Sequence, residues 1–221
     1  MEKDQHNSMS EDNCTLKKSI SNDDMSLLPL SAFEGTIYLV ERFEDISFAL
    51  DYLKNQPILG FDTETKPSFS KGQNNPVSLL QLSTSDTAFL FRINQIGLPP
   101  GLIKILASPK ILKIGAAIRD DIKILQKVCH FKPAGFIELQ EMVQDYGIEN
   151  FSLKKLSAIV LGFRISKSQR LTNWDADMLT EPQQIYAATD AWVAYEIYSR
   201  LLEVPVTYGS FSSEEGEVIP G

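Results

Sequence analysis

The stretch ILGFDTET, residues 58–65, begins with apolar residues and then places two carboxylates, Asp62 and Glu64, two positions apart. The apolar start predicts a short strand, and because strand side chains alternate between faces, Asp62 and Glu64 project from the same face. Two neighbouring anions repel each other, and each loses hydration beside a sheet. Two interpretations remain open: a solvated strand end, or part of a site for Mg²⁺ or Mn²⁺, which favour carboxylate oxygens.

Around this strand, the chain alternates between strand and helix patterns. The predicted strands cover residues 35–40, 57–64, 77–84, 87–93, 110–117 and the start of 135–143. The predicted helices cover residues 43–55, 101–108, 119–129, the end of 135–143, 152–162 and 180–203. The strands at 77–84 and 87–93 form a hairpin, because only Ser85 and Asp86 separate them. This order indicates an α/β fold with a mixed sheet and helices packed on it.

The helix over residues 180–203 has the clearest signals in the chain. Thr180 is its N-cap, Pro182 lies in its first turn, and no breaker follows until Pro205. Tyr186 and Asp190 are four residues apart, so both side chains lie on one face of this helix. Asp190 stands among small and apolar neighbours, where it is either a hydrogen-bonded structural residue or part of a functional site.

Another aspartate pair lies at the start of the helix over 119–129. Ile118, Ile122 and Leu125 mark the buried face of this helix. Asp121 borders that face, whereas Asp120 points outward. An acidic residue in a first helical turn is favoured by the helix dipole, so capping is the alternative to a functional role for Asp121.

Length and composition indicate one folded domain with two tails. The chain has 221 residues, of which 43% are hydrophobic. We expect a flexible N-terminal extension over 1–31, a domain over 32–205 and a flexible acidic tail over 206–221. The sequence predicts no transmembrane helix, no signal peptide and no membrane partner. The two cysteines, Cys14 and Cys129, form no disulfide framework or zinc motif, which favours a reducing, cytoplasmic setting.

The net charge of −8 is unevenly distributed along the chain. Residues 1–32 carry −3 and residues 203–221 carry −4, so the segment between them carries only −1. Within it, residues 151–174 contain no acid and five bases: Lys154, Lys155, Arg164, Lys167 and Arg170. These bases form either a solvated helix face and loop or a surface that holds a phosphate backbone.

Together, FDTE, GAAIRDDIKIL and YAATD resemble the motifs of the DEDD superfamily of 3′–5′ exonucleases. More narrowly, they are similar to its tyrosine-bearing DEDDy branch, which includes ribonuclease D and the exonuclease domain of Werner syndrome helicase. LLQLST and NWDADMLTEPQQ also have the look of this family. The resemblance covers residues 58–202 and implies a ribonuclease H-like mixed β-sheet flanked by α-helices.

The chain departs from the family pattern at two positions. The family often carries Asn or Gly where this chain has Ala117, and some relatives carry an aromatic residue where it has Lys66. The histidine-bearing branch does not match, because the chain contains only His6 and His130, neither of them near Asp190.

The resemblance implies a metal-dependent 3′–5′ exonuclease that acts on single-stranded 3′ ends of DNA or RNA and releases 5′-mononucleotides. It implies two Mg²⁺ or Mn²⁺ ions, with Asp62 shared by both. Glu64 and Asp190 would complete the first site, Asp121 would support the second, and Tyr186 would orient the attacking water. Two alternatives remain: a non-catalytic nucleic-acid-binding module with the same fold, and a phosphohydrolase of small nucleotides.

Overall fold

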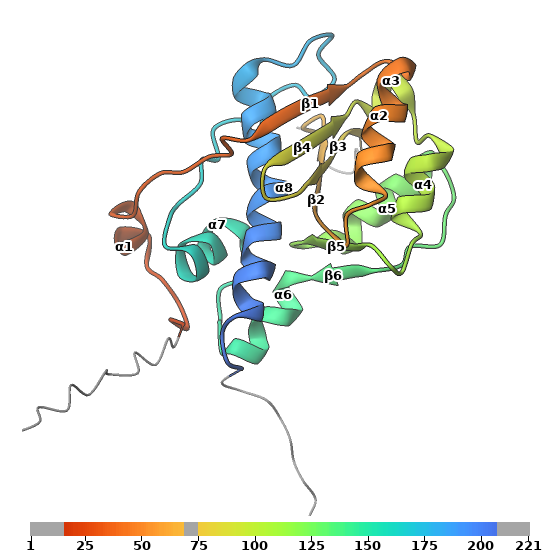
Figure 1. The fold of residues 1–221 in the computed structure, drawn as a ribbon. Helices are drawn as coiled ribbons and strands as arrows, with labels where there is room; N and C mark the ends of the chain where they lie inside the picture. Colours follow the sequence, from red (N-terminus) through yellow and green to blue (C-terminus); the bar gives the residue numbers. More distant parts are fainter. Residues whose placement is uncertain (1–15, 69–74, 207–221) are drawn as a thin grey trace, which may run out of the picture.

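A mixed sheet with helices on both faces makes up the protein, which the computed structural model describes over residues 16–68 and 75–206 (Figure 1). In these ranges, six strands follow the spatial order β1-β4-β3-β2-β5-β6. Their bounds are β1 (Thr36–Val40), β2 (Ile58–Thr65), β3 (Val77–Ser83), β4 (Thr87–Phe91), β5 (Leu112–Gly115) and β6 (Phe136–Glu138). Strand β3 is antiparallel to β2 and β4, and the other neighbours are parallel. The predicted hairpin and α/β fold are confirmed.

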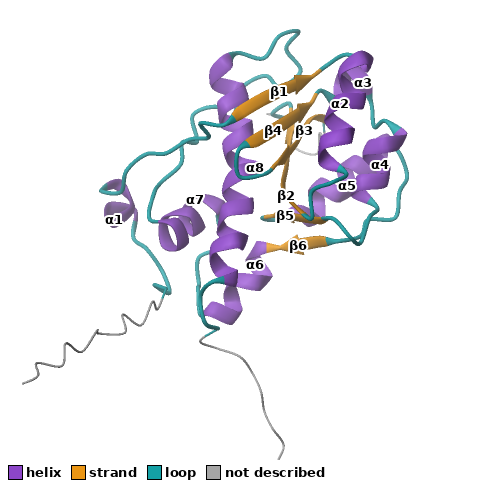
Figure 2. Cartoon of the chain, in the orientation of Figure 1, coloured by secondary structure: helices purple, strands orange, loops and turns teal. Residues whose placement is uncertain are grey.

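Helices cover both faces of this sheet (Figure 2). Their bounds are α1 (Asn22–Ser26), α2 (Phe43–Leu53), α3 (Ile93–Ile96), α4 (Pro100–Leu106), α5 (Ile118–Val128), α6 (Leu139–Met142), α7 (Leu153–Leu156) and α8 (Glu181–Leu202). A 3₁₀ turn (Val143–Tyr146) follows α6 and a π-helical turn (Ser157–Leu161) follows α7. The sequence did not predict α3, whose single turn ends at Gly97 with a positive φ. None of the described helices is long and apolar enough to cross a bilayer.

The long helix α8 begins where the sequence predicts. The Thr180 hydroxyl accepts a hydrogen bond from the N–H of Gln183, and the Gln183 side chain accepts one from the N–H of Thr180. This reciprocal pair satisfies two backbone groups that a helix start would otherwise leave without partners. Helix α8 then runs for 22 residues across the face of the sheet.

The alternation of β2 separates two apolar cores. Leu59 and Phe61 point into the core that the sheet forms with α2, α4 and α5. The other face of β2 meets α8 so closely that a Cβ atom at Gly60 would come within 1.8 Å of the carbonyl oxygen of Ala191. Only glycine permits this approach, and it places the middle of α8 over the carboxylates of β2.

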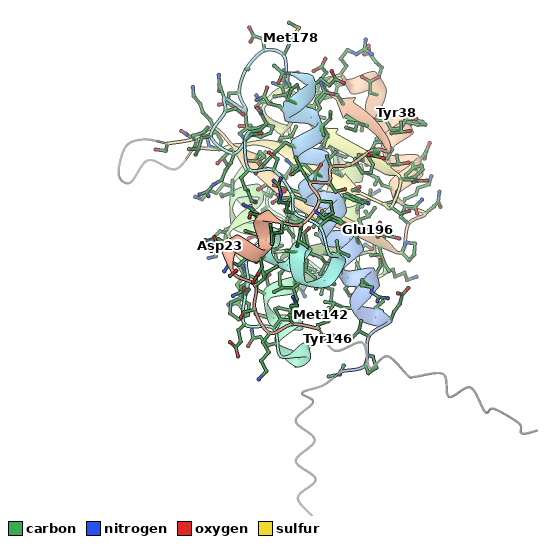
Figure 3. The ribbon with its side chains drawn as sticks, turned by 90° about the vertical axis from the view of Figure 1, so that its left-hand side faces the viewer. Asp23, Tyr38, Met142, Tyr146, Met178 and Glu196 are labelled. Carbon is green, nitrogen blue, oxygen red and sulfur yellow. The ribbon has the colours of Figure 1, made fainter. Side chains whose placement is uncertain are left out.

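The sequence predicts a flexible extension over residues 1–31, and the part of it that the structure describes, residues 16–31, packs beside α7. Figure 3 shows α1, with Asp23 labelled, next to α7. Ile20 and Met25 are buried against Ala158, and the backbone of Arg164 pairs with the chain around Leu30. Two apolar side chains and this backbone pairing therefore hold a polar segment in place. Residues 1–15 and 207–221 lie outside the described residues.

Candidate active site

Three carboxylates from two elements meet where α8 crosses β2. Asp62 and Glu64 come from the same face of β2, and Asp190 comes from the middle of α8. One oxygen of each side chain lies within 4.8 Å of the others. Asp62 and Glu64 are half-buried, and Asp190 is only 4% exposed. The structure thus brings together three of the four acids that the sequence analysis selected.

Asp190 has the features of a metal ligand more than those of a structural residue. Its Oδ1 atom is buried and has no hydrogen-bond donor among the described residues. A buried carboxylate oxygen without a partner is costly, and a divalent cation in the cluster would remove that cost. The donor set also fits, because carboxylate oxygens are the ligands that Mg²⁺ and Mn²⁺ prefer.

The raised pKa values of the clustered carboxylates also favour metal binding. Burial, followed by the charges of Asp190, Asp121 and Glu64, raises the pKa of Asp62 well above its usual range. Burial and the charge of Asp190 raise the pKa of Glu64 to about 8, and burial also raises the pKa of Asp190. Each carboxylate resists ionisation beside the others, so a divalent cation would bind in exchange for protons.

Tyr186 lies one turn before Asp190 on the same face of α8. Its side chain is buried, and burial together with the charge of Asp190 raises its pKa. The hydroxyl therefore stays protonated at neutral pH. It can donate or accept a hydrogen bond, but it cannot act as a general base.

Asp121 approaches from the other side of β2. It lies in the first turn of α5, and its Oδ1 accepts a hydrogen bond of 2.5 Å from the Thr63 hydroxyl. Its carboxylate is outside the group of three, yet its charge raises the pKa values of Asp62 and Glu64. Asp120 is exposed and pairs with Lys123 instead. Burial raises the pKa of Asp121 to about 6.

The five predicted basic residues lie in different surroundings. Lys167 and Arg170 are exposed, and their charges lower the pKa of Glu64. Arg164 has another partner, because its Nε donates a hydrogen bond to the carbonyl oxygen of Leu28. Lys154 and Lys155 lie in α7 and are half-buried. Lys167 and Arg170 are thus close enough to interact electrostatically with the carboxylates, whereas Arg164 anchors the N-terminal segment.

A hollow of about 210 Å³ opens beside the cluster. Asp62, Asp190 and Lys167 line it together with Gln140 and Ser152, which sequence reasoning missed. Gln140 and Ser152 belong to no motif that the chemistry requires. Thr63 was also missed, because its side chain points to the face of β2 opposite to that of Asp62 and Glu64.

Comparison with known proteins agrees with this geometry. A family model described as 3′–5′ exonuclease matches residues 39–204. The bifunctional 3′–5′ exonuclease/ATP-dependent helicase WRN of Mus musculus is 31% identical over 217 residues, which cover 94% of this chain and 15% of that protein. Exonuclease 3′–5′ domain-containing protein 2 of Homo sapiens is 34% identical over 170 residues, which cover 72% of this chain and 27% of that protein. The chain thus spans a minor part of these relatives.

Solved structures show the same fold. The Nibbler EXO domain of Aedes aegypti superposes with a TM-score of 0.70 at 26% identity, covering 78% of this chain and 91% of that one. RNase D of Escherichia coli superposes with a TM-score of 0.68 at 23% identity, covering 76% of this chain and 44% of that one. The predicted ribonuclease H-like sheet and the resemblance to the DEDDy exonucleases are confirmed. The chain belongs to the 3′–5′ exonuclease family.

Proposed function

We propose that this protein hydrolyses phosphodiester bonds from the 3′ end of a DNA or RNA single strand and releases 5′-mononucleotides. One observation carries the proposal: the oxygens of Asp62, Glu64 and Asp190 converge within 4.8 Å, and one oxygen of Asp190 is buried with no hydrogen-bond partner in the part of the chain that the structure describes. Asp121 and Tyr186 stand beside this group, so the arrangement suits metal-dependent hydrolysis. A cytoplasmic location, expected from the cysteine usage, stays a prediction.

Each residue of the site would have a separate role in this hydrolysis. Asp62, Glu64 and Asp190 would hold one Mg²⁺ or Mn²⁺ ion, and Asp62 with Asp121 would hold a second. When bound, two such ions stabilise the attacking and leaving oxygens of an in-line displacement and lower the pKa of water. Tyr186, which stays protonated, would orient the attacking water through its hydroxyl. Lys167 and Arg170 would hold the phosphate backbone without reading sequence.

The proposal is tested with oligonucleotides labelled at the 3′ or the 5′ end, as both DNA and RNA. With Mn²⁺ we expect a ladder that shortens from the 3′ end, and with EDTA we expect none. Asp121→Asn should lower kcat by at least about 100-fold, because removing one group that stabilises the transition state costs this much in other enzymes. Asp120→Asn is the matched control, since Asp120 is exposed on the same helical turn, and its activity should equal that of the wild type.

The same assay separates the alternatives. Binding of the strand without cleavage in Mn²⁺ would favour a non-catalytic module. Cleavage of mononucleotides or dinucleotides, with longer strands left intact, would favour a small-nucleotide phosphohydrolase. Equal loss of activity in Asp120→Asn and Asp121→Asn would contradict the assignment of Asp121.

A further inference from the structure

The turn between β5 and α5 has an unusual backbone. Ala117, just before α5, has φ 63° and ψ 32°, and it is the one non-glycine residue in the described ranges with a positive φ. In this left-handed conformation the Cβ atom of an L-residue crowds the neighbouring carbonyl oxygen. The local sequence therefore disfavours the turn, and contacts from elsewhere must hold it.

Glu138 supplies those contacts from the end of β6. Its Oε1 accepts a hydrogen bond of 2.9 Å from the N–H of Ala117, and its Oε2 accepts one of 2.9 Å from the N–H of Ile118. The parallel pairing of β5 and β6 sets Gly115 opposite Glu138, which brings the carboxylate to the turn. A carboxylate is also favoured at this place for two reasons. The first N–H groups of α5 have no partner within the helix, and the positive end of the helix dipole lies here.

The turn that Glu138 holds determines where Asp121 lies. Asp121 follows Ile118 by three residues, within the first turn of α5, and its carboxylate meets the Thr63 hydroxyl. Rotation of that first turn would move the Asp121 carboxylate away from β2. The other three acids stand on β2 and α8 and do not depend on this turn.

We infer that Glu138 is a positioning residue for Asp121. It holds the strained turn at Ala117 in place and so fixes the position of the Asp121 carboxylate, which completes the second metal site. The inference rests on the proposed two-metal function. It concerns Asp121 alone, so loss of Glu138 should weaken one ion and leave the other in place.

The test uses Glu138→Gln, which keeps the size of the side chain but loses one acceptor oxygen. Mn²⁺ binding is measured by titration calorimetry, and kcat and KM are measured on an oligonucleotide. We expect two ions in the wild type. In the variant we expect the weaker ion to lose about tenfold or more in affinity, as when partners of metal ligands are removed elsewhere. We expect kcat to fall and KM to stay unchanged.

A second substitution separates clamping from charge. Ala117→Gly lets the turn adopt its left-handed conformation without steric cost, so Glu138→Gln with Ala117→Gly should recover most of the lost affinity and kcat. Glu138→Asp keeps the charge but is too short to reach both N–H groups. It should show the same loss of Mn²⁺ affinity and kcat, and the same recovery with Ala117→Gly. It replaces Glu138→Gln in the test if that variant does not fold. Glu141→Gln is the matched control, because Glu141 is exposed and pairs with Arg119.

Three outcomes would overturn the inference. If Glu138→Gln and Glu138→Asp bind both ions as the wild type does, Glu138 does not position Asp121. If Ala117→Gly restores nothing, Glu138 acts through its charge and not through the turn. If the wild type itself binds fewer than two ions, the proposed two-metal function fails first, and the inference fails with it.

Discussion

Lys167 is exposed in the loop between α7 and α8, and its charge lowers the pKa values of Glu64 and Asp190. A cation this close to the carboxylates can hold the phosphate next to the bond that is cut. Lys167→Gln should therefore raise the dissociation constant for a single strand. It should also reduce the slope of log K against log salt by about 0.7, the value for one lost phosphate contact.

Fluorescence anisotropy in EDTA measures this binding without cleavage of the strand. Lys110→Gln is the matched control: Lys110 is also exposed, but it precedes β5, at the end of the sheet away from the carboxylates. An unchanged salt slope in Lys167→Gln would remove Lys167 from the binding surface.

At the scale of elements, the N-terminal segment binds the backbone of Arg164, in the loop that leads to Lys167. The N–H of Ser31 donates to the carbonyl oxygen of Arg164, and the N–H of Arg164 donates to that of Pro29. Deletion of residues 1–31 removes these bonds and the buried side chains of Ile20 and Met25. We expect the free energy of unfolding to fall by about 3 kcal/mol, the lower estimate for two such side chains, and single-strand affinity to fall with it.

Urea denaturation and anisotropy measure the two effects. Deletion of residues 1–15 is the control, because it leaves the packed segment intact, and it should change neither quantity. If both deletions have the same small effect, the packing of residues 16–31 contributes little to stability or to binding.

At the scale of the whole molecule, the carboxylate cluster links stability to pH. Glu64 has a pKa of about 8 in the folded, metal-free protein, against an ordinary value of 4.5. Between these values the folded state keeps a proton that the unfolded state has lost, so the free energy of unfolding decreases as pH rises through this window. The stabilisation is complete below pH 4.5 and is lost above about pH 8. In EDTA, the Tm should therefore fall across this range.

Glu64→Gln tests the origin of that slope, because glutamine stays neutral at every pH. The variant should have a flatter profile than the wild type and a higher Tm at pH 8, with each 1 kcal/mol appearing as about 2–4 °C. Saturating Mn²⁺ should also flatten the wild-type profile, since cations then replace the protons. Parallel profiles for variant and wild type in EDTA would show that Glu64 does not titrate in this window.

Much of the fold was predictable because its signals are local. The N-cap at Thr180, the hairpin turn at Ser85 and Asp86 and the alternation of β2 each depend on a few neighbouring residues. Lys113 shows where local signals end. It lies in the predicted strand β5, is fully buried, and donates from Nζ to the backbone carbonyl oxygens of Ile105, Ser108, Ile111 and Ala134, which come from α4 and from the loops before β5 and β6. No periodicity in the sequence predicts such a contact.

The sequence by itself determined the strand that carries Asp62 and Glu64, the helix that carries Tyr186 and Asp190, and the family resemblance that joins them, because spacing along a strand or helix sets which side chains share a face. Only the tertiary structure decided that Asp190 has a buried oxygen with no partner among the described residues. It also decided that the Thr63 hydroxyl donates to Asp121, that Glu138 binds the turn before α5, and that Arg164 anchors residues 16–31. These features depend on the approach of segments far apart in the chain, and that approach is set by the close contact at Gly60, by strand pairing and by burial.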